Sequence, residues 1–450
     1  MVLKTLPFLL LYLFCFSCGN EQTKKESTLN SQKIISNIKE QKFSGEVEKK
    51  LIEKVNQALK AEENNDNKKA QNYLLEYSEL FEVEYSKANI PGTDIQGIKN
   101  KYKSLREMKE DFKEEETMMA HGLKGKALKL PTAAFINPFV YHPETLKQVL
   151  EVYKDFGRLY INENFTDRGK PRIEEVRSAK TPWSGHWYPY SGNDLYKDKN
   201  SPLAKFDKLV TFLVGYDSQA RSFQEKMMKG LGGTSWEGLC DAWALASVLT
   251  DEPTKSLTVS GVKFSIADQK ALLTFSHLKY PFKQYGIQYA GNYKTDGTHD
   301  DIKPEAFHRV LLSVLGEQKR AVIIDDMAGV EVWNKPLYRY RWKTVKDPGV
   351  KNAYLVTAYP WLIKERTRET SKLTSGKDTI APTYYYRLYV DKSTVEDGKY
   401  LVIAGEWINQ SRDSHPDNIK VPHTKGTLGS HNSEFNKNIE VFERYLLNSY

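Results

Sequence analysis

Cysteine is scarce in this chain, which has three among its 450 residues: Cys15, Cys18 and Cys240. Because two of them lie close to the N-terminus and one stands alone, a framework of disulfide bonds is excluded as a source of stability. The chain also lacks a block of like charge, since its net charge of +8 is spread through segments of mixed sign. That distribution argues against nucleic acid as the main partner.

Several motifs with known chemistry are missing as well. The nine histidines are dispersed along the chain and lack the short spacings of a zinc site. There is no glycine-rich phosphate loop and no G-x-S-x-G turn of a serine hydrolase. The sequence therefore predicts no metal site, no nucleotide site and no serine nucleophile.

The long hydrophobic run of the chain lies at its N-terminus, in "MVLKTLPFLLLYLFCFSCGN". It follows Lys4 and is too short to span a bilayer as a permanent helix, so it predicts a secretory signal. Ser17 before Cys18, with a glycine after it, resembles the end of a lipoprotein signal. We predict a signal peptide over residues 1–17 and a lipid anchor at Cys18, which would hold the protein at a membrane of the bacterial cell envelope, the outer membrane or the cell surface. An ordinary signal peptide, cut nearby, is the alternative.

Composition divides the rest of the chain into three segments. Residues 18–32 are polar and predict a disordered tether. Residues 33–120 carry apolar side chains at helical spacing, as at Val47 and Leu51, and predict a small helical module without chemistry of its own. Residues 121–450 are predicted to form the domain that holds the candidate catalytic residues.

That third segment shows helices first and strands afterwards. Glycine and proline interrupt "TPWSGHWYPYSGN" (181–193), which predicts a loop. Helices are predicted at 240–250, 267–277 and 304–315. Runs rich in β-branched and aromatic residues predict strands in "RAVIID", "YLVTAYPWL", "TYYYRLYVD" and "KYLVIAGEW". This order predicts an α+β domain with an antiparallel sheet.

Cys240 stands where one of these helices is predicted to begin, in "TSWEGLCDAWALASVL". In the first turn of a helix, backbone N–H groups and the helix dipole stabilise a thiolate, so we expect the thiol pKa to fall from about 8.5 toward neutrality. The same N–H groups can hold an oxyanion. Asp241 opposes ionisation. We interpret this single thiol of an exported chain as a nucleophile; the alternative is a buried thiol that serves as a small hydrophobe.

A thiol nucleophile needs a base and a group that orients the base. We predict His308 as the base, because Pro304 places it early in a helix, where neutral imidazole is favoured. His415 is the alternative. For the orienting acid we predict Asp326, at the end of "AVIIDD". Three other aspartates are alternatives: Asp325, Asp391 and Asp417.

Separate blocks of the sequence resemble, in the same order, those of the transglutaminase elicitor family, first known from oomycete plant pathogens. The blocks are "WEGLCDAWA", "PEAFHRVLLSVLG", "DDMAGVEVWNKP", "AGEW" and "SHPDN". The run from Trp333 to Pro336 resembles the elicitor core peptide of that family, with Lys335 where the family has glutamine. The resemblance covers about residues 180–420 and does not include the helical module.

The resemblance implies a papain-like, transglutaminase-like cysteine-enzyme fold and a protein-glutamine γ-glutamyltransferase, an acyltransferase that responds to calcium. It places Cys240 at the nucleophile, and Trp333 and Pro336 at positions tied to activity and recognition. Its substrates would be proteins that carry glutamine and lysine. We further predict that Trp236 and Trp333 shield a thioester from water. The alternatives are a papain-like cysteine peptidase or amidase and a non-catalytic lipoprotein that binds envelope or host components.

Overall fold

A computed structural model gives the fold of the chain. It describes residues 35, 38–39, 43–64, 66–89, 95–100, 102–103, 143–162, 166–167, 170–229, 236–287, 301–326, 331–412 and 414–447. The predicted signal peptide, the predicted tether and Cys18 lie outside these residues. None of the helices in these ranges is long and apolar enough to cross a membrane.

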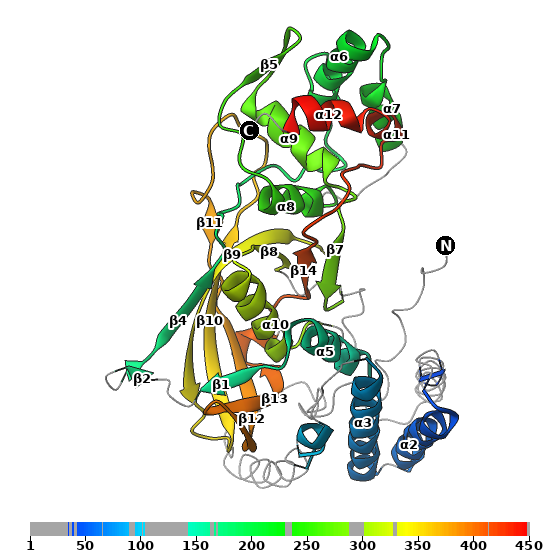
Figure 1. Cartoon of the computed structure of the whole chain (residues 1–450), viewed down its shortest axis with the longest axis vertical. Helices are drawn as coiled ribbons and strands as arrows, with labels where there is room; N and C mark the ends of the chain where they lie inside the picture. Colours follow the sequence, from blue (N-terminus) through cyan, green and yellow to red (C-terminus); the bar gives the residue numbers. More distant parts are fainter. Residues whose placement is uncertain are drawn as a thin grey trace, which may run out of the picture.

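A ten-stranded antiparallel sheet forms the body of the molecule (Figure 1). Eight strands follow one another in the order β1-β13-β12-β10-β9-β8-β14-β7, while β4 pairs with β9 and β11 pairs with β10. The strands are β1 (Tyr160–Asn162), β4 (Ile173–Arg177), β7 (Phe282–Tyr285), β8 (Val322–Asp325), β9 (Asn334–Lys346), β10 (Ala353–Ile363), β11 (Thr379–Ile380), β12 (Tyr384–Glu396), β13 (Lys399–Trp407) and β14 (Asn418–Pro422).

A lobe of helices sits above one end of this sheet in Figure 1. It is built from the chain between β4 and β7 together with the C-terminal residues. Its members are α6 (Pro202–Val214), α7 (Ala220–Met228), α8 (Cys240–Leu249), the hairpin of β5 (Leu257–Val259) and β6 (Val262–Phe264), α9 (Ile266–Ser276), α11 (Ser433–Asn436) and α12 (Ile439–Tyr445). Local signals fix the ends of these helices. Ser201 caps the start of α6, Gly215 ends it with a φ of 87°, and Ser265 and Asp268 form a capping box at the start of α9.

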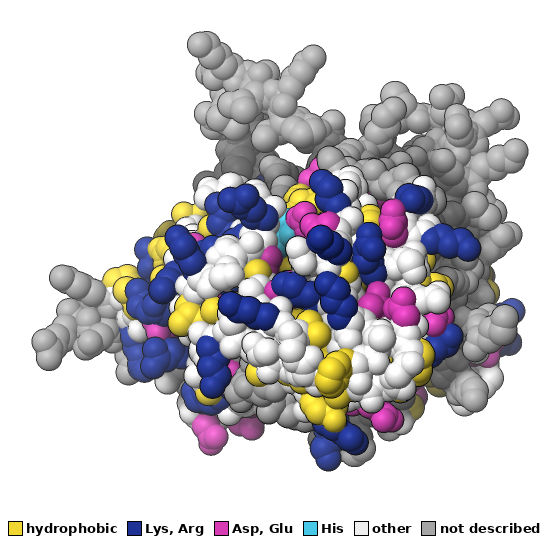
Figure 2. Space-filling model, turned by 90° about the horizontal axis from the view of Figure 1, so that it is seen from above, with side chains coloured by type: hydrophobic (Ala, Val, Ile, Leu, Met, Phe, Trp, Pro, Cys, Tyr) yellow, Lys and Arg dark blue, Asp and Glu magenta, His cyan; other side chains and the backbone are white. Residues whose placement is uncertain are grey.

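The face of this lobe that is seen from above carries mixed charge. Figure 2 shows lysine and arginine side chains scattered among acidic, polar and apolar ones, without one continuous basic block. The even mixture follows from the sequence, in which acidic and basic residues alternate over short distances.

The N-terminal helices form a second helical part beside the sheet. They are α2 (Gly45–Glu63), α3 (Asn67–Asn89) and α5 (Pro143–Phe156). The helix α2 packs on α3, α3 packs on α5, and α5 reaches α10 (Pro304–Leu311) and β7. Their apolar faces belong to the same buried cluster as the sheet, because Leu51, Leu75 and Leu150 share it with Val356 and Leu388.

The predicted α+β class is confirmed, and so are its main elements. Helices occur at the three expected places, the third continuing from α10 as a π-helical turn at Leu312–Glu317. All four expected strands are present as β8, β10, β12 and β13. Sequence patterns did not indicate that β1 and β4, which precede the helical lobe, join the same sheet as the later strands.

The helix α8 joins the lobe to the sheet. Its apolar residues leave no polar face, and Trp243, Ala244 and Leu245 are at most 1 % exposed. It packs on α9 on the lobe side and on β8 and β9 on the sheet side, and Ile323 of β8 meets Ala244 and Leu245. A helix that is apolar all round is stable only in such a buried position. Its N-terminus is therefore fixed against the sheet.

His308 of α10 lies within the sheet core. It is 3 % exposed, and its Nδ1 is 2.7 Å from the hydroxyl of Tyr340 and 2.5 Å from that of Tyr386. Burial, with a smaller contribution from Arg309, lowers the pKa of His308 from 6.5 to about 3. The imidazole is therefore neutral at physiological pH and forms part of the packing between α10, β9 and β12.

A buried neutral histidine makes stability depend on pH. The pKa of folded His308 is below that of the unfolded chain, so the unfolded state binds more protons and stability is lost as pH falls from 6.5 toward about 3. Between about pH 7 and about pH 4 we expect His308→Gln to lose about 3 kcal/mol less free energy of unfolding than the parent. Urea unfolding at both pH values measures it; an equal loss in the two proteins would contradict the assignment.

Candidate active site

Cys240 is the first residue of α8, as the sequence predicts. The chain that leads to it is held against the 181–193 loop, because Leu239 N–H donates to the carbonyl of Trp187 at 2.6 Å and Tyr190 N–H donates to that of Glu237 at 2.8 Å. Gly238 is required by this close approach, since a Cβ there would meet the Trp187 carbonyl oxygen at 2.8 Å. The loop therefore fixes where the helix starts.

The sulfur of Cys240 has polar partners although its residue is only 8 % exposed. The side-chain amide of Asn334 donates from Nδ2 to Sγ at 3.5 Å, and the thiol lies 3.5 Å from the carbonyl oxygen of Val332, to which it can donate. Both partners come from the start of β9 and the residues before it. The sulfur is therefore buried in a polar environment.

Asn334 belongs to a row of polar residues across three neighbouring strands. It lies opposite Asp325 of β8, which in turn lies opposite Asn418 of β14. Residues directly opposite one another share a face of the sheet, so the three side chains are on the same face. Two positions further along β14, on that face, Lys420 Nζ donates to Asn334 Oδ1 at 2.7 Å. The face that α8 covers thus supplies the amide that contacts the sulfur and the ammonium that contacts that amide.

The pKa of the Cys240 thiol is raised above its ordinary value of 9.0, in contrast to the prediction from the helix dipole. Burial is the largest cause, and the charge of Asp241 adds to it. Asn334, through its side chain and its backbone, and the charge of Lys420 act in the opposite direction. The helix start alone does not make Cys240 acidic, because the same packing that places it there removes water from the thiol.

The structure does not bring His308 to Cys240. His308 contacts Tyr340, which lies six residues beyond Asn334 on β9, and six residues of strand span about 20 Å. The role of His308 as base therefore disagrees with its position. The sequence placed it at a helix start, which is correct, but gave no sign that the start faces tyrosines of the sheet.

The alternative base, His415, also has other partners. Its Nδ1 is 2.7 Å from the carbonyl oxygen of Ser411, its Nε2 is 2.9 Å from Asp301, and its ring stacks on Trp407. Within the described ranges, no imidazole lies within hydrogen-bond distance of Cys240 Sγ.

The four candidate acids have separate positions. Asp326 pairs with Lys335 at 2.7 Å, and burial raises the pKa of its carboxyl. Asp325 accepts the backbone N–H of Trp333 at 2.9 Å and so holds the residue before Asn334. Asp391 accepts from Ser393 and Thr394 in a turn of β12, and the backbone carbonyl of Asp417 accepts from Ile302. None of these contacts orients an imidazole, and Asp325 lies nearest in the sheet to the residues around the sulfur.

Aromatic rings flank the residues that hold the sulfur. Trp333 is half-buried, donates from its indole to Glu331 at 3.0 Å, and meets the ring of Trp187 at a centroid distance of 5.6 Å. Trp236 lies half-buried in the turn before α8. Pro336 is buried in β9 opposite Ile323. The ring in contact with Trp333 is therefore that of Trp187. The sequence predicted the 181–193 loop that carries Trp187 but named no site residue in it.

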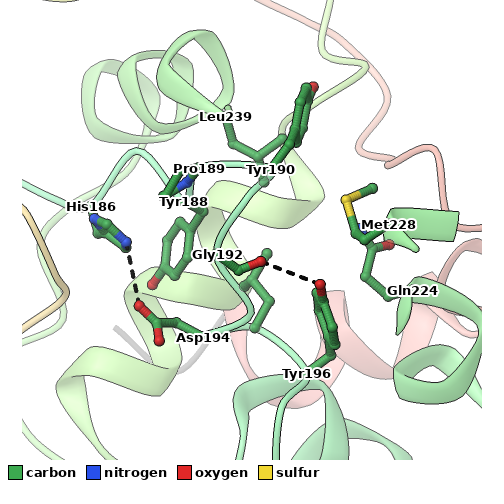
Figure 3. A pocket seen from close by; sticks show the side chains of 11 residues that line it. His186, Tyr188, Pro189, Tyr190, Gly192, Asp194, Tyr196, Gln224, Met228 and Leu239 are labelled. Carbon is green, nitrogen blue, oxygen red and sulfur yellow. Dashed lines mark hydrogen bonds and ion pairs between the residues drawn. The ribbon is translucent and has the colours of Figure 1, made fainter. Parts of the chain in front are cut away.

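A pocket lies beside the start of α8 (Figure 3). Residues 186–196 form much of its lining, with Gln224 and Met228 of α7 and Leu239 completing it. His186 Nε2 lies 3.5 Å from the carboxylate of Asp194, while burial lowers the pKa of His186 and so favours its neutral form. Tyr196 donates to the carbonyl of Gly192 at 3.2 Å. His186, Tyr188 and Tyr190 face the pocket, whereas Trp187 contacts Trp333. The segment thus separates the pocket from the aromatic pair.

Calcium is the cofactor that the resemblance implies, and it takes about six to eight oxygen ligands. Within the described ranges, no group of three or more histidine, cysteine, aspartate or glutamate side chains could hold a metal ion. These residues do not fit a calcium site, and we derive no catalytic step through the ion.

Sequence reasoning missed Asn334 and Lys420. The sequence named Asn334 only as part of the Trp333–Pro336 run, because an uncharged amide in a strand does not by itself indicate a site residue. Lys420 stands in "NIKVP", where polar and apolar residues alternate. Such alternation is typical of a strand with one solvated face, yet here α8 lies over the sheet and all five residues are buried.

The electrostatics around Cys240 give a prediction for Asp241. Its carboxylate raises the thiol pKa, so Asp241→Asn removes that effect and lowers it. The rate of alkylation of Cys240 by iodoacetamide, measured against pH and located by peptide mass spectrometry, reaches half its maximum at a lower pH in the variant. An unchanged or higher midpoint would contradict this account.

Comparison with known proteins agrees with the family predicted from the sequence. Residues 214–434 match the family model described as transglutaminase elicitor. No curated protein matches the sequence. Among solved structures, the chain is similar to the GP42 transglutaminase from Phytophthora sojae, with a TM-score of 0.49, 18 % sequence identity, and coverage of 67 % of this chain and 98 % of that chain. The matched range includes Cys240, Asn334 and Lys420, so the residues around the sulfur lie within the part of the chain that resembles the transglutaminase elicitor family.

Proposed function

We propose that the chain is a protein-glutamine γ-glutamyltransferase whose nucleophile is Cys240. One observation carries the proposal: the sulfur at the start of α8 accepts a hydrogen bond from the side-chain amide of Asn334, the first residue of β9. Both residues lie in the range that matches the transglutaminase elicitor model. A thiol that served only as a small hydrophobe would need no such donor.

In the proposed first step, Cys240 Sγ as thiolate attacks the carbonyl carbon of a glutamine side chain. The carbon–nitrogen bond breaks, the nitrogen takes up a proton from a water molecule, and ammonia departs, so that a thioester remains on Sγ. In the first turn of α8, Trp243 N–H donates to the carbonyl of Leu239 and Ala242 N–H donates to Asp241 Oδ1. The backbone N–H groups of Cys240 and Asp241 precede them and are the ones suited to hold the oxyanion of the tetrahedral intermediate. Asn334 keeps the sulfur oriented through Nδ2.

In the second step, the amine of a lysine side chain attacks the thioester carbon. The carbon–sulfur bond breaks, the amine nitrogen loses a proton, and an isopeptide bond forms while the thiolate is regenerated. The rings of Trp187 and Trp333 lie in contact beside Asn334 and would limit the access of water to the thioester. This arrangement favours amine over hydrolysis. The partners are therefore proteins that carry accessible glutamine and lysine.

Replacing the nucleophile tests the function directly. Cys240→Ala is expected to abolish incorporation of dansyl-cadaverine into casein, because no thioester can form, while His308→Gln, which leaves the sulfur and its partners in place, retains it. In-gel fluorescence measures the product.

Other outcomes would identify the alternatives. Release of new amino termini from casein without amine incorporation would show a cysteine peptidase. Labelling that persists in Cys240→Ala would refute the assignment of the nucleophile. Binding to envelope components that is unchanged in Cys240→Ala, with no labelling by the parent, would favour a non-catalytic lipoprotein.

We also propose that Cys18 carries the lipid that attaches the protein to the bacterial envelope. The small residue before it and the glycine after it support this assignment. Cells that express the full chain are expected to incorporate labelled palmitate into it, and Cys18→Ala to lose the label while Cys15→Ala retains it. Labelling that survives in Cys18→Ala would contradict the anchor.

A further inference from the structure

Lys420 is buried without an acidic partner in the described part of the chain. It is 8 % exposed, its Nζ donates to Asn334 Oδ1 at 2.7 Å, and it lies 5.3 Å from the centroid of the Phe282 ring on β7. No described carboxylate forms an ion pair with it, whereas Lys335 on the other face of β9 pairs with Asp326. An ammonium taken out of water is costly unless negative charge lies nearby, and on this face that charge can come from Asp325, opposite Asn334, or from an ionised Cys240.

The hydrogen bonds of Asn334 point to where that charge forms. An ammonium has only donors, so Lys420 can bond only the oxygen of the amide. The nitrogen end of the same amide must then point the other way, where it donates to Cys240 Sγ. A donor to sulfur favours the thiolate over the thiol. With the lysine absent, the amide is free to turn and present its oxygen, which would favour the protonated thiol instead.

We propose that Lys420 is the positioning residue of this site: by fixing the orientation of the Asn334 amide and supplying a positive charge, it favours the thiolate of Cys240 over the thiol. Lys420 does not touch the substrate. Among the described residues, Lys420 supplies the positive charge near the sulfur that a protonated histidine supplies in a cysteine–histidine pair. The inference rests on the proposed function only in taking the thiolate as the reactive form.

Among the described residues, four charged or titratable groups face this part of the site from the elements around it. Asp241 of α8 opposes the thiolate and Lys420 of β14 favours it. Tyr190, in the loop, has a pKa raised by burial and by the charges of Asp241 and Cys240. Asp325 of β8 accepts the backbone N–H of Trp333. Lys420 is therefore the cation that acts on the sulfur.

The experiment is the pH dependence of Cys240 alkylation by iodoacetamide in the full chain, with the product located by peptide mass spectrometry. Lys420→Met is expected to slow alkylation about tenfold near pH 8, since each unit of pKa changes the thiolate fraction about tenfold, and to leave the plateau rate at high pH unchanged. Lys420→Arg, which keeps the charge and the donors, is expected to retain most of the parent rate. A variant that slows alkylation equally at every pH would overturn the proposal, because that result reports access rather than ionisation.

A double-mutant cycle separates orientation of the amide from the charge alone. In an Asn334→Ala background, Lys420→Met is expected to have a much smaller effect on the midpoint than in the parent. An equal effect in both backgrounds would overturn the role of the amide. If Lys420→Met does not fold, as judged by circular dichroism, Lys420→Gln gives the same comparison with a polar end and no charge.

These readouts need no glutamine substrate and so are independent of the transferase assay. If the pH profiles follow the expectation while no amine is incorporated, the positioning role stands and the proposed function fails. If amine is incorporated but the profiles do not respond to Lys420, the function stands and the positioning role fails.

Discussion

The account depends on the packing of one apolar helix, α8, against two strands of the sheet. Because α8 is buried between α9 and the face of β8 and β9, its N-terminus cannot move relative to the row of polar residues at the end of that face. Asn334 in that row then meets the sulfur of Cys240 at hydrogen-bond distance. The 181–193 loop completes the constraint from the other side through the Trp187 carbonyl. The position of the thiol is therefore set by the burial of α8 and by backbone hydrogen bonds. Both form only when the whole domain folds.

The same burial has a chemical consequence. Removing water from Cys240 raises its pKa, so the site must supply compensating interactions before the thiol can act at neutral pH. Among the described residues those interactions come from an amide and an ammonium, with no imidazole bonded to the sulfur. The two histidines predicted as bases have structural partners, tyrosine hydroxyls for His308 and Asp301 for His415. The α+β class follows from the sequence, while the groups that contact the sulfur follow from the packing of α8 on the sheet.

Features with a strong local signal were predictable from the sequence. The unbroken apolar run after Gly238 predicts a buried helix that begins at Cys240, and β-branched and aromatic runs predict β8, β10, β12 and β13. Relations across the sheet were not predictable, because register decides which residues face one another. His308 is correctly placed on its helix but wrongly matched to Cys240, since only the pairing of β9 and β12 shows that it faces Tyr340 and Tyr386. Asn334 and Lys420 were not predictable because only the packing of α8 on the sheet buries them beside the sulfur.

The central claim is that Cys240 forms a covalent thioester with a glutamine side chain. The direct measurement is the intact mass of the protein after brief incubation with a short glutamine peptide, without added amine, and quenching in acid. The account predicts a gain equal to the mass of the peptide less ammonia, mapped to Cys240 and released by hydroxylamine. The absence of that adduct, in protein whose Cys240 is still alkylated by iodoacetamide, would contradict it.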